Sequence, residues 1–132
     1  MSVLVYIESE KGSFKKAALE IASYGSAVAK KSNSSLIAVV FNVGDCSLLG
    51  RYGVDKVLSI QTTQDFNADI YAYILKQAIE KEQSKIVVLS NSADSKYIAP
   101  LLCVGLKAGY VPNVVELPIS TSPFQVKRSV FT

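Results

Sequence analysis

The sequence contains no histidine, which is the side chain that most often serves as a catalytic base near neutral pH. Without it, a serine or cysteine nucleophile lacks the imidazole that usually activates such a group. The Gly-x-Ser-x-Gly motif is absent as well, and the few carboxylates lie on different loops. We therefore predict that the chain is not an enzyme and carries no catalytic residue.

Cysteine is scarce, because the chain has only Cys46 and Cys103, and the two do not form a Cys-x-x-Cys pair. A structural zinc site needs four soft or imidazole ligands, so the chain alone cannot supply one. Cys103 lies in the apolar run at residues 101–104, where we expect a buried, inert thiol. The sequence thus predicts no metal-binding residue.

Charge of one sign is not in excess, since 14 basic residues stand against 11 acidic ones and the net charge is +3. The lysines are spread along the chain, which argues against the clustered basic surface of nucleic-acid-binding proteins. No apolar run approaches the length of a membrane span, and no signal segment opens the chain. We expect a soluble protein of the bacterial cytoplasm, without nucleic-acid partners or membrane insertion.

The loops also lack the glycine-rich motifs that hold phosphates, and Gly-x-Gly-x-x-Gly does not occur. The loop at residues 8–12 has one glycine together with Glu8 and Glu10, and these two acids would repel a phosphate. We interpret this segment as a solvated loop without a binding role.

A second polar loop, at residues 90–96, contains three serines and a lysine that could bind an anion. Asp94 opposes an anion, and no glycine lets the backbone approach one closely. Capping of the following helix by Ser92, Asp94 or Ser95 is therefore the favoured interpretation.

Against these absences, 49% of the 132 residues are hydrophobic, which is enough for the core of one domain. Short runs rich in β-branched residues alternate with segments whose apolar residues recur at helical spacing. Strands are expected at residues 3–7, 35–41, 57–60, 86–89, 111–117 and 124–131. Helices are expected at residues 14–31, 45–50, 68–83 and 95–106, and a linker at 120–123. This alternation predicts a single three-layer α/β/α domain, Rossmann-like, with helices on both faces of a mainly parallel sheet.

Particular residues have predicted roles in these helices. Ser13 is expected to cap the first helix, and Asn67 or Asp65 to cap the helix at 68–83. Gly25 lies inside the first helix, where glycine costs about 1 kcal/mol relative to alanine, so a close packing contact is expected there. Pro100 predicts that the last helix effectively begins later than residue 95 or bends.

Five groups of residues occur in order along the chain. They are Val3–Glu8 with Gly12 and Lys16–Glu20, Tyr52–Val57, Lys96–Pro100 with Leu102 and Leu106, Val111–Val114, and Arg128–Thr132. In this order and at this spacing they resemble the N-terminal domain of the alpha subunit of electron-transfer flavoproteins. The resemblance covers nearly the whole chain, and Asn113 departs from it, because the family more often has aspartate there.

The resemblance implies that residues 1–132 are the N-terminal α/β domain of such a subunit, of the adenine nucleotide alpha hydrolase-like type. A C-terminal domain holding most of the FAD contacts would be absent from this chain. A beta subunit of similar fold would bind AMP and complete a heterodimer. That heterodimer would carry electrons from acyl-CoA and other dehydrogenases to a membrane quinone oxidoreductase or similar acceptor. This chain would be a scaffold with no cofactor-binding residue of its own.

Two other functions stay open at this point. A small adenine-nucleotide-binding domain similar to the universal stress proteins would need a glycine-rich loop after the fourth strand, and residues 90–95 have serines but no glycine. A free-standing interaction domain is the third hypothesis. An open reading frame that continues past Thr132, beside a gene for a partner subunit, would favour the flavoprotein.

Overall fold

The structure is a computed structural model that describes residues 2–62, 67–90, 92–106, 120–121 and 124–125. Its centre is a four-stranded parallel sheet in the order β5-β4-β1-β6. The strands are β1 (Ser2–Ile7), β4 (Ser35–Phe41), β5 (Lys56–Ile60) and β6 (Ser84–Val88). Every residue of β1 is buried, as is typical of a parallel strand covered on both faces.

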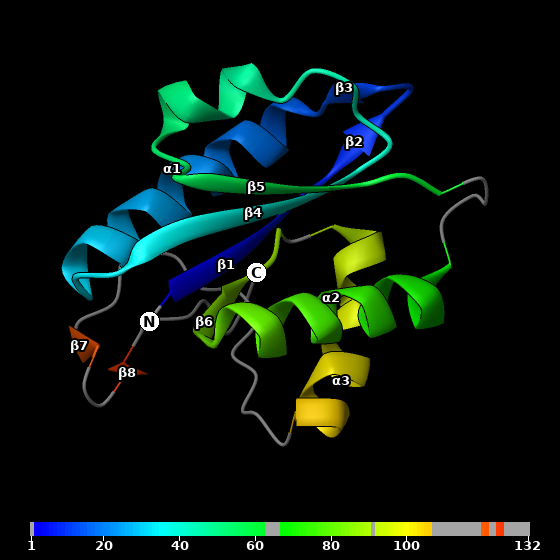
Figure 1. Ribbon diagram of the computed structural model, residues 1–132. Coiled ribbons are helices and arrows are strands. Elements are labelled where there is room, and N and C mark those ends of the chain that lie inside the picture. The colour runs from blue at the N-terminus through cyan, green and yellow to red at the C-terminus, as the bar shows by residue number, and fades with distance from the viewer. Residues whose placement is uncertain (1, 63–66, 91, 107–119, 122–123, 126–132) are drawn as a thin grey trace, which may run out of the picture.

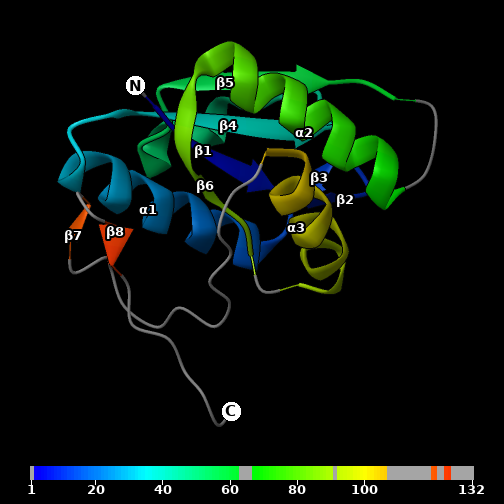
Figure 2. The ribbon, with the colours of Figure 1, turned by 90° about the horizontal axis from the view of Figure 1, so that it is seen from below.

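Helices cover both faces of this sheet (Figure 1). Helix α1 (Lys16–Lys31) lies on one face, while α2 (Ala68–Glu82) and α3 (Ala93–Leu106) lie on the other. Helices α2 and α3 contact each other and lie side by side in both views (Figures 1 and 2). The predicted three-layer α/β/α architecture with a parallel sheet is therefore confirmed.

Each face of the sheet has its own core, because successive side chains of a strand point to opposite faces. The cluster on the α1 face includes Val3, Val5, Ile7, Ala22 and Val28. The cluster on the face of α2 and α3 includes Leu4, Tyr6, Leu75, Ile98 and Leu102. The odd and even residues of β1 thus join the sheet to different helices.

The segment between β1 and α1 is a short hairpin rather than the expected loop. Strands β2 (Ser9–Glu10) and β3 (Ser13–Phe14) pair antiparallel around Lys11 and Gly12, which both have positive φ angles. Two positive φ angles are what a tight two-residue hairpin turn requires. The prediction that Ser13 caps α1 is wrong, because Ser13 pairs in β3 and the residue before the helix, Lys15, makes no side-chain cap.

Two glycines lie at close contacts between α1 and its neighbours. At Gly25 an added Cβ would lie 3.1 Å from Leu36 Cδ1, so the predicted close contact is confirmed. Gly53 follows the 3-10 helix η1 (Ser47–Tyr52), which occupies the place of the short helix expected at 45–50. Its φ of +88° is left-handed, and an added Cβ would collide with the hydroxyl of Ser26.

The two helices on the other face begin with side-chain caps. Asn67 Oδ1 accepts a hydrogen bond of 3.1 Å from the backbone N–H of Ile70, which confirms Asn67 as a cap, while Asp65 lies outside the described residues. Helix α3 begins at Ala93, so of the two effects predicted from Pro100 the later start is wrong, while a bend stays a prediction. Proline costs this helix one hydrogen bond, and burial of its apolar neighbours Ile98 and Leu102 holds the turn in place.

The end of the chain is described only in part. Strands β7 (Ser120–Thr121) and β8 (Phe124–Gln125) pair antiparallel in a separate two-stranded sheet. The prediction of a linker at 120–123 is therefore wrong for its first two residues. The strand predicted at 111–117, the rest of the strand predicted at 124–131 and the side chain of Cys103 lie outside what the structure describes. Within the described residues, no helix is both long enough and apolar enough to cross a membrane.

Candidate functional site

The strand order places a switch point between β1 and β6. From β1 the chain moves to β4 and then to β5 on one side, and it returns to add β6 on the other side. In open parallel sheets, ligands bind outside the carboxyl ends of the strands at such a point. The residues that follow β1 and β6 are therefore the first place to look for a site.

Glu8 follows β1 directly and is buried, with only 4% of its surface exposed. The hydroxyl of Ser90, just after β6, donates a hydrogen bond to Glu8 Oε2, and the Ser95 hydroxyl lies 3.4 Å from that of Ser90. The interpretation of residues 8–12 as a solvated loop is therefore wrong at Glu8, although Glu10 is exposed. This hydrogen bond joins the two sides of the switch point.

A signal in the sequence could have found Glu8. Side chains of β1 alternate between the two faces, and Leu4 and Tyr6 belong to the core under α2 and α3. Glu8 is the next residue in that even-numbered series, so the strand directs it to the same face. Its charge and the polar residues after it made it look like the start of a loop.

The second oxygen of Glu8 has a different environment. Among the described residues, Oε1 is buried and has no hydrogen-bond partner. The Lys15 ammonium lies 3.9 Å from it, which is an ion-pair contact longer than a hydrogen bond, and the Lys15 side chain is 40% exposed. Buried carboxylate oxygens normally accept a hydrogen bond, and Glu8 Oε1 accepts none from the described residues.

The loop after β6 works as a helix cap. Ser92 Oγ accepts a hydrogen bond of 3.1 Å from the backbone N–H of Ser95, and the Lys96 N–H donates to the Ser92 carbonyl at 3.0 Å. The predicted capping of α3 is confirmed for Ser92. The backbone N–H groups of Ser95 and Lys96, which could otherwise bind an anion, therefore donate to Ser92. The hydroxyl of Ser90 donates to Glu8.

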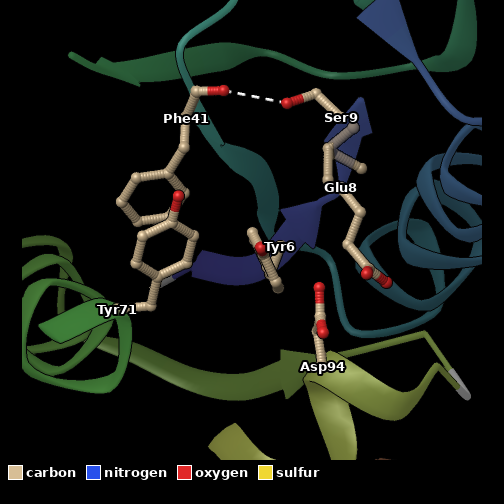
Figure 3. Close-up of a pocket in the computed structure, with 7 residues that line it drawn as sticks. Tyr6, Glu8, Ser9, Phe41, Tyr71 and Asp94 are labelled. Atoms are coloured by element: carbon tan, nitrogen blue, oxygen red, sulfur yellow. Dashed lines mark hydrogen bonds between the residues drawn. The ribbon is translucent and has the colours of Figure 1, made fainter. Parts of the chain in front are cut away.

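A small pocket of about 60 Å³ opens beside Glu8 (Figure 3). Its lining residues are Tyr6, Ile7, Glu8, Ser9, Phe41, Tyr71 and Asp94. Figure 3 shows the side chains of Glu8 and Asp94 directed toward one another on one side of the pocket, Phe41 and Tyr71 on the other, and Tyr6 between them. The Ser9 hydroxyl donates to the Phe41 carbonyl at 2.9 Å and joins the ends of β1 and β4.

The three aromatic rings of the pocket contact one another. Phe41 and Tyr71 are stacked, with ring centroids 3.9 Å apart and planes 10° from parallel. Tyr6 meets both rings edge-on, with centroids 5.8 Å and 6.5 Å away. β1, β4 and α2 each contribute one ring, so the contacts between the rings join these three elements at the pocket.

Burial raises the pKa of the Tyr6 hydroxyl well above its usual value, and the charge of Glu8, the Tyr71 hydroxyl and the charge of Asp94 raise it further. Tyr6 therefore stays protonated at neutral pH and cannot act as a base there. Burial likewise raises the pKa of the Cys46 thiol, which disfavours a reactive thiolate.

Within the described residues, no group of three or more cysteine, aspartate or glutamate side chains is arranged to hold a metal ion. The sequence assigned no catalytic, cofactor-binding or metal-binding residue to this chain, and that assignment stays a prediction. What the structure adds is a buried, charged pocket that the sequence did not reveal.

Comparison with known proteins gives three results. A solved structure of a universal stress protein family member from Burkholderia pseudomallei is 12% identical, with 74% of this chain and 88% of that chain covered and a TM-score of 0.49. The alpha subunit of the electron transfer flavoprotein of Bacillus subtilis (strain 168) is 24% identical over 83 residues, which are 61% of this chain. The match spans 26% of the length of that subunit. A family model described as the electron transfer flavoprotein domain matches residues 3–132, so the chain belongs to the electron transfer flavoprotein domain family.

Proposed function

We propose that the chain is the N-terminal domain of an electron-transfer flavoprotein alpha subunit and serves as a scaffold for its heterodimer with a beta subunit. The observation that carries this proposal is the family match, which runs over residues 3–132 and so includes the described four-stranded sheet, except Ser2, and helices α1, α2 and α3. The similarity to an alpha subunit, rather than to another member of the family, supports the choice of subunit.

In this proposal the complete heterodimer transfers electrons from acyl-CoA and other dehydrogenases to a membrane quinone oxidoreductase or a similar acceptor. FAD is held mainly by a C-terminal domain outside this chain, and AMP is held by the beta subunit. The compartment is the bacterial cytoplasm, in keeping with the bacterial relative. The chain itself contributes shape and contacts, and no step of the electron transfer occurs on its own residues.

The switch point supports a scaffold over the alternative, a small adenine-nucleotide-binding domain. A nucleotide there would need donors for its phosphates. Instead the carboxylates of Glu8 and Asp94 occupy this region, and the Ser90 hydroxyl donates to Glu8. A pocket of about 60 Å³ is also far smaller than the several hundred Å³ of ordinary small-molecule sites.

The test is assembly with a beta subunit from the same organism. The purified chain and the beta subunit are mixed and analysed by size-exclusion chromatography with light scattering, and we expect a one-to-one complex. A universal stress protein of similar size, mixed with the same beta subunit, is the control and should elute separately. Two separate peaks for the chain and the beta subunit, together with saturable ATP binding by the chain, would overturn the proposal in favour of the alternative.

A further inference from the structure

The pocket beside Glu8 has an excess of negative charge. Glu8 and Asp94 both line it, whereas Lys15, whose ammonium lies 3.9 Å from Glu8 Oε1, is not a lining residue. That contact is too long for a hydrogen bond. The Lys15 side chain is 40% exposed, so water screens its charge more than it screens that of Glu8.

Glu8 Oε1 needs a hydrogen-bond donor that the described residues do not provide. The side chain of Glu8 is 5% exposed, and Oε1 is the one buried side-chain oxygen or nitrogen among the described residues that has no hydrogen-bond partner. Leaving a buried charged acceptor unpaired costs more than making the bond gains. A positively charged group with an N–H donor would both form the missing hydrogen bond to Glu8 Oε1 and neutralise its charge.

Aromatic rings form another part of the pocket lining. The rings of Tyr6, Phe41 and Tyr71 supply this part of the lining, and they offer an apolar surface to the carbon attached to an ammonium nitrogen. Carboxylates on one side and rings on the other are the features of a site for an organic ammonium group.

The small volume of the pocket limits the ligands that it can bind. A volume of about 60 Å³ leaves room for a group of only a few heavy atoms, which suits an ammonium group with one attached carbon. A nucleotide does not fit. A divalent metal ion needs a larger set of oxygen ligands than two carboxylates provide, and no metal-binding cluster occurs within the described part of the chain.

We propose that this pocket binds a primary ammonium group, supplied either by a small amine or by the tip of a lysine side chain of another protein. The ammonium donates to Glu8 Oε1, pairs with the Asp94 carboxylate and lies against the aromatic wall. This site does not depend on the proposed scaffold function, because its features belong to the chain alone.

The test uses methylammonium chloride as the probe and follows the NMR signals of the Tyr6 ring and of the Glu8 and Asp94 amides. We expect shifts that saturate with methylammonium and do not appear with sodium chloride at equal ionic strength. Tetramethylammonium, which is too large and has no N–H donor, should give no saturating shifts. A methylammonium response no different from that of sodium chloride would overturn the proposal.

Variants locate the binding. Glu8→Gln and Asp94→Asn should each weaken methylammonium binding by about tenfold or more, because each removes one charge from the contact. Glu80→Gln removes an exposed carboxylate of α2 outside the pocket and should leave the affinity unchanged. Asp94 is only partly buried, so Asp94→Asn remains informative if Glu8→Gln does not fold. An affinity that stays the same in Asp94→Asn would contradict the site.

A second probe identifies the source of the ammonium group. Nα-acetyl-lysine amide carries the same ammonium at the end of a four-carbon stem, so it tests whether the pocket accepts a lysine side chain. Binding of both probes at similar affinity supports a lysine of a partner protein, while binding of methylammonium alone supports a small amine. Failure of both probes would contradict the proposal.

Discussion

The hydroxyl of Ser90 donates a hydrogen bond to the carboxylate of Glu8, although the two residues are 82 positions apart in the sequence. The bond ties the residue after β1 to the loop after β6, on the two sides of the switch point. It also places a negative charge inside the domain, where other folds of this architecture receive a ligand.

Replacing Ser90 with alanine should destabilise the domain. The change leaves the buried Glu8 carboxylate without its hydroxyl donor, and we expect a loss of about 1–3 kcal/mol in the free energy of unfolding. Urea denaturation followed by circular dichroism measures this loss. Ser23→Ala, at an exposed position of α1, is the control and should change the value by less than about 0.5 kcal/mol. Equal stability of the two variants would contradict the role given to Ser90.

Gly53→Ala should destabilise the protein by about 2–4 kcal/mol, because it adds a left-handed backbone penalty and a collision with Ser26. Gly50→Ala, inside the preceding 3-10 helix η1, is the control, since its Cβ would meet no atom within 4 Å. In a Ser26→Gly background the collision disappears and only the backbone penalty remains. Thermal denaturation of the parent, Gly53→Ala, Ser26→Gly and the double variant should show that partial rescue; a Gly53→Ala cost that is equal in both backgrounds would exclude the collision.

Alanine substitutions can compare the helix caps observed in the structure with the cap predicted from the sequence. Ser92→Ala and Asn67→Ala each remove an observed helix cap and should cost about 1 kcal/mol. Ser13→Ala removes a residue that the sequence predicts as a cap but that pairs in β3, and its cost should stay below about 0.5 kcal/mol. A larger loss for Ser13→Ala than for Ser92→Ala, measured by chemical denaturation, would reverse the structural assignment.

Stability should fall at alkaline pH through Tyr6. Its pKa is raised in the folded protein, so the unfolded chain releases the proton first as pH rises past about 10. Stability is full below that pH and is lost above it, by at most about 1.4 kcal/mol per pH unit. Burial raises the pKa of Tyr24 too, which adds a loss of the same sign.

Denaturation curves between about pH 9 and pH 11 check this effect. Tyr6→Phe should lose less stability over the range than the parent protein does, because the variant has no buried hydroxyl to ionise. Tyr73→Phe, at a residue that is 64% exposed, should behave like the parent. Identical alkaline losses in Tyr6→Phe and the parent would show that Tyr6 does not contribute.

Adenine nucleotides should bind weakly or not at all to this chain. The acids Glu8 and Asp94 oppose phosphates, and the Ser90 hydroxyl is already bound to Glu8. Isothermal titration with AMP and with ATP should give no saturable heat, and a universal stress protein that binds ATP is the positive control. Micromolar binding to the chain would favour the universal stress protein alternative.

The sheet could be predicted because its strands are continuous apolar runs such as residues 35–41, where burial on both faces leaves a clear pattern. The hairpin of β2 and β3 was missed because two-residue strands are too short to show a period. The start of α3 was misplaced because the helix-breaking tendency of Pro100 was given more weight than the cap at Ser92.

The pocket could not be predicted, because its parts come from β1, β4, α2 and α3. Bringing Glu8 and Asp94 together requires β6 to lie beside β1, and the strand order is not encoded in any local pattern. Each acid alone looked like a loop residue. Their shared environment depends on contacts between distant segments, which only the folded chain defines.

Because β1 is an inner strand, one of its edges stays unpaired while the rest of the chain is being synthesised. It pairs with β4 on one side and with β6 on the other, where Val5 lies opposite Val88. A chain leaves the ribosome N-terminus first, so β1 emerges long before its second neighbour. Until Val88 has emerged, one edge of β1 presents unpaired backbone groups to other chains. The nascent domain is thus open to aggregation for much of its translation, and a ribosome that pauses before β6 prolongs that interval.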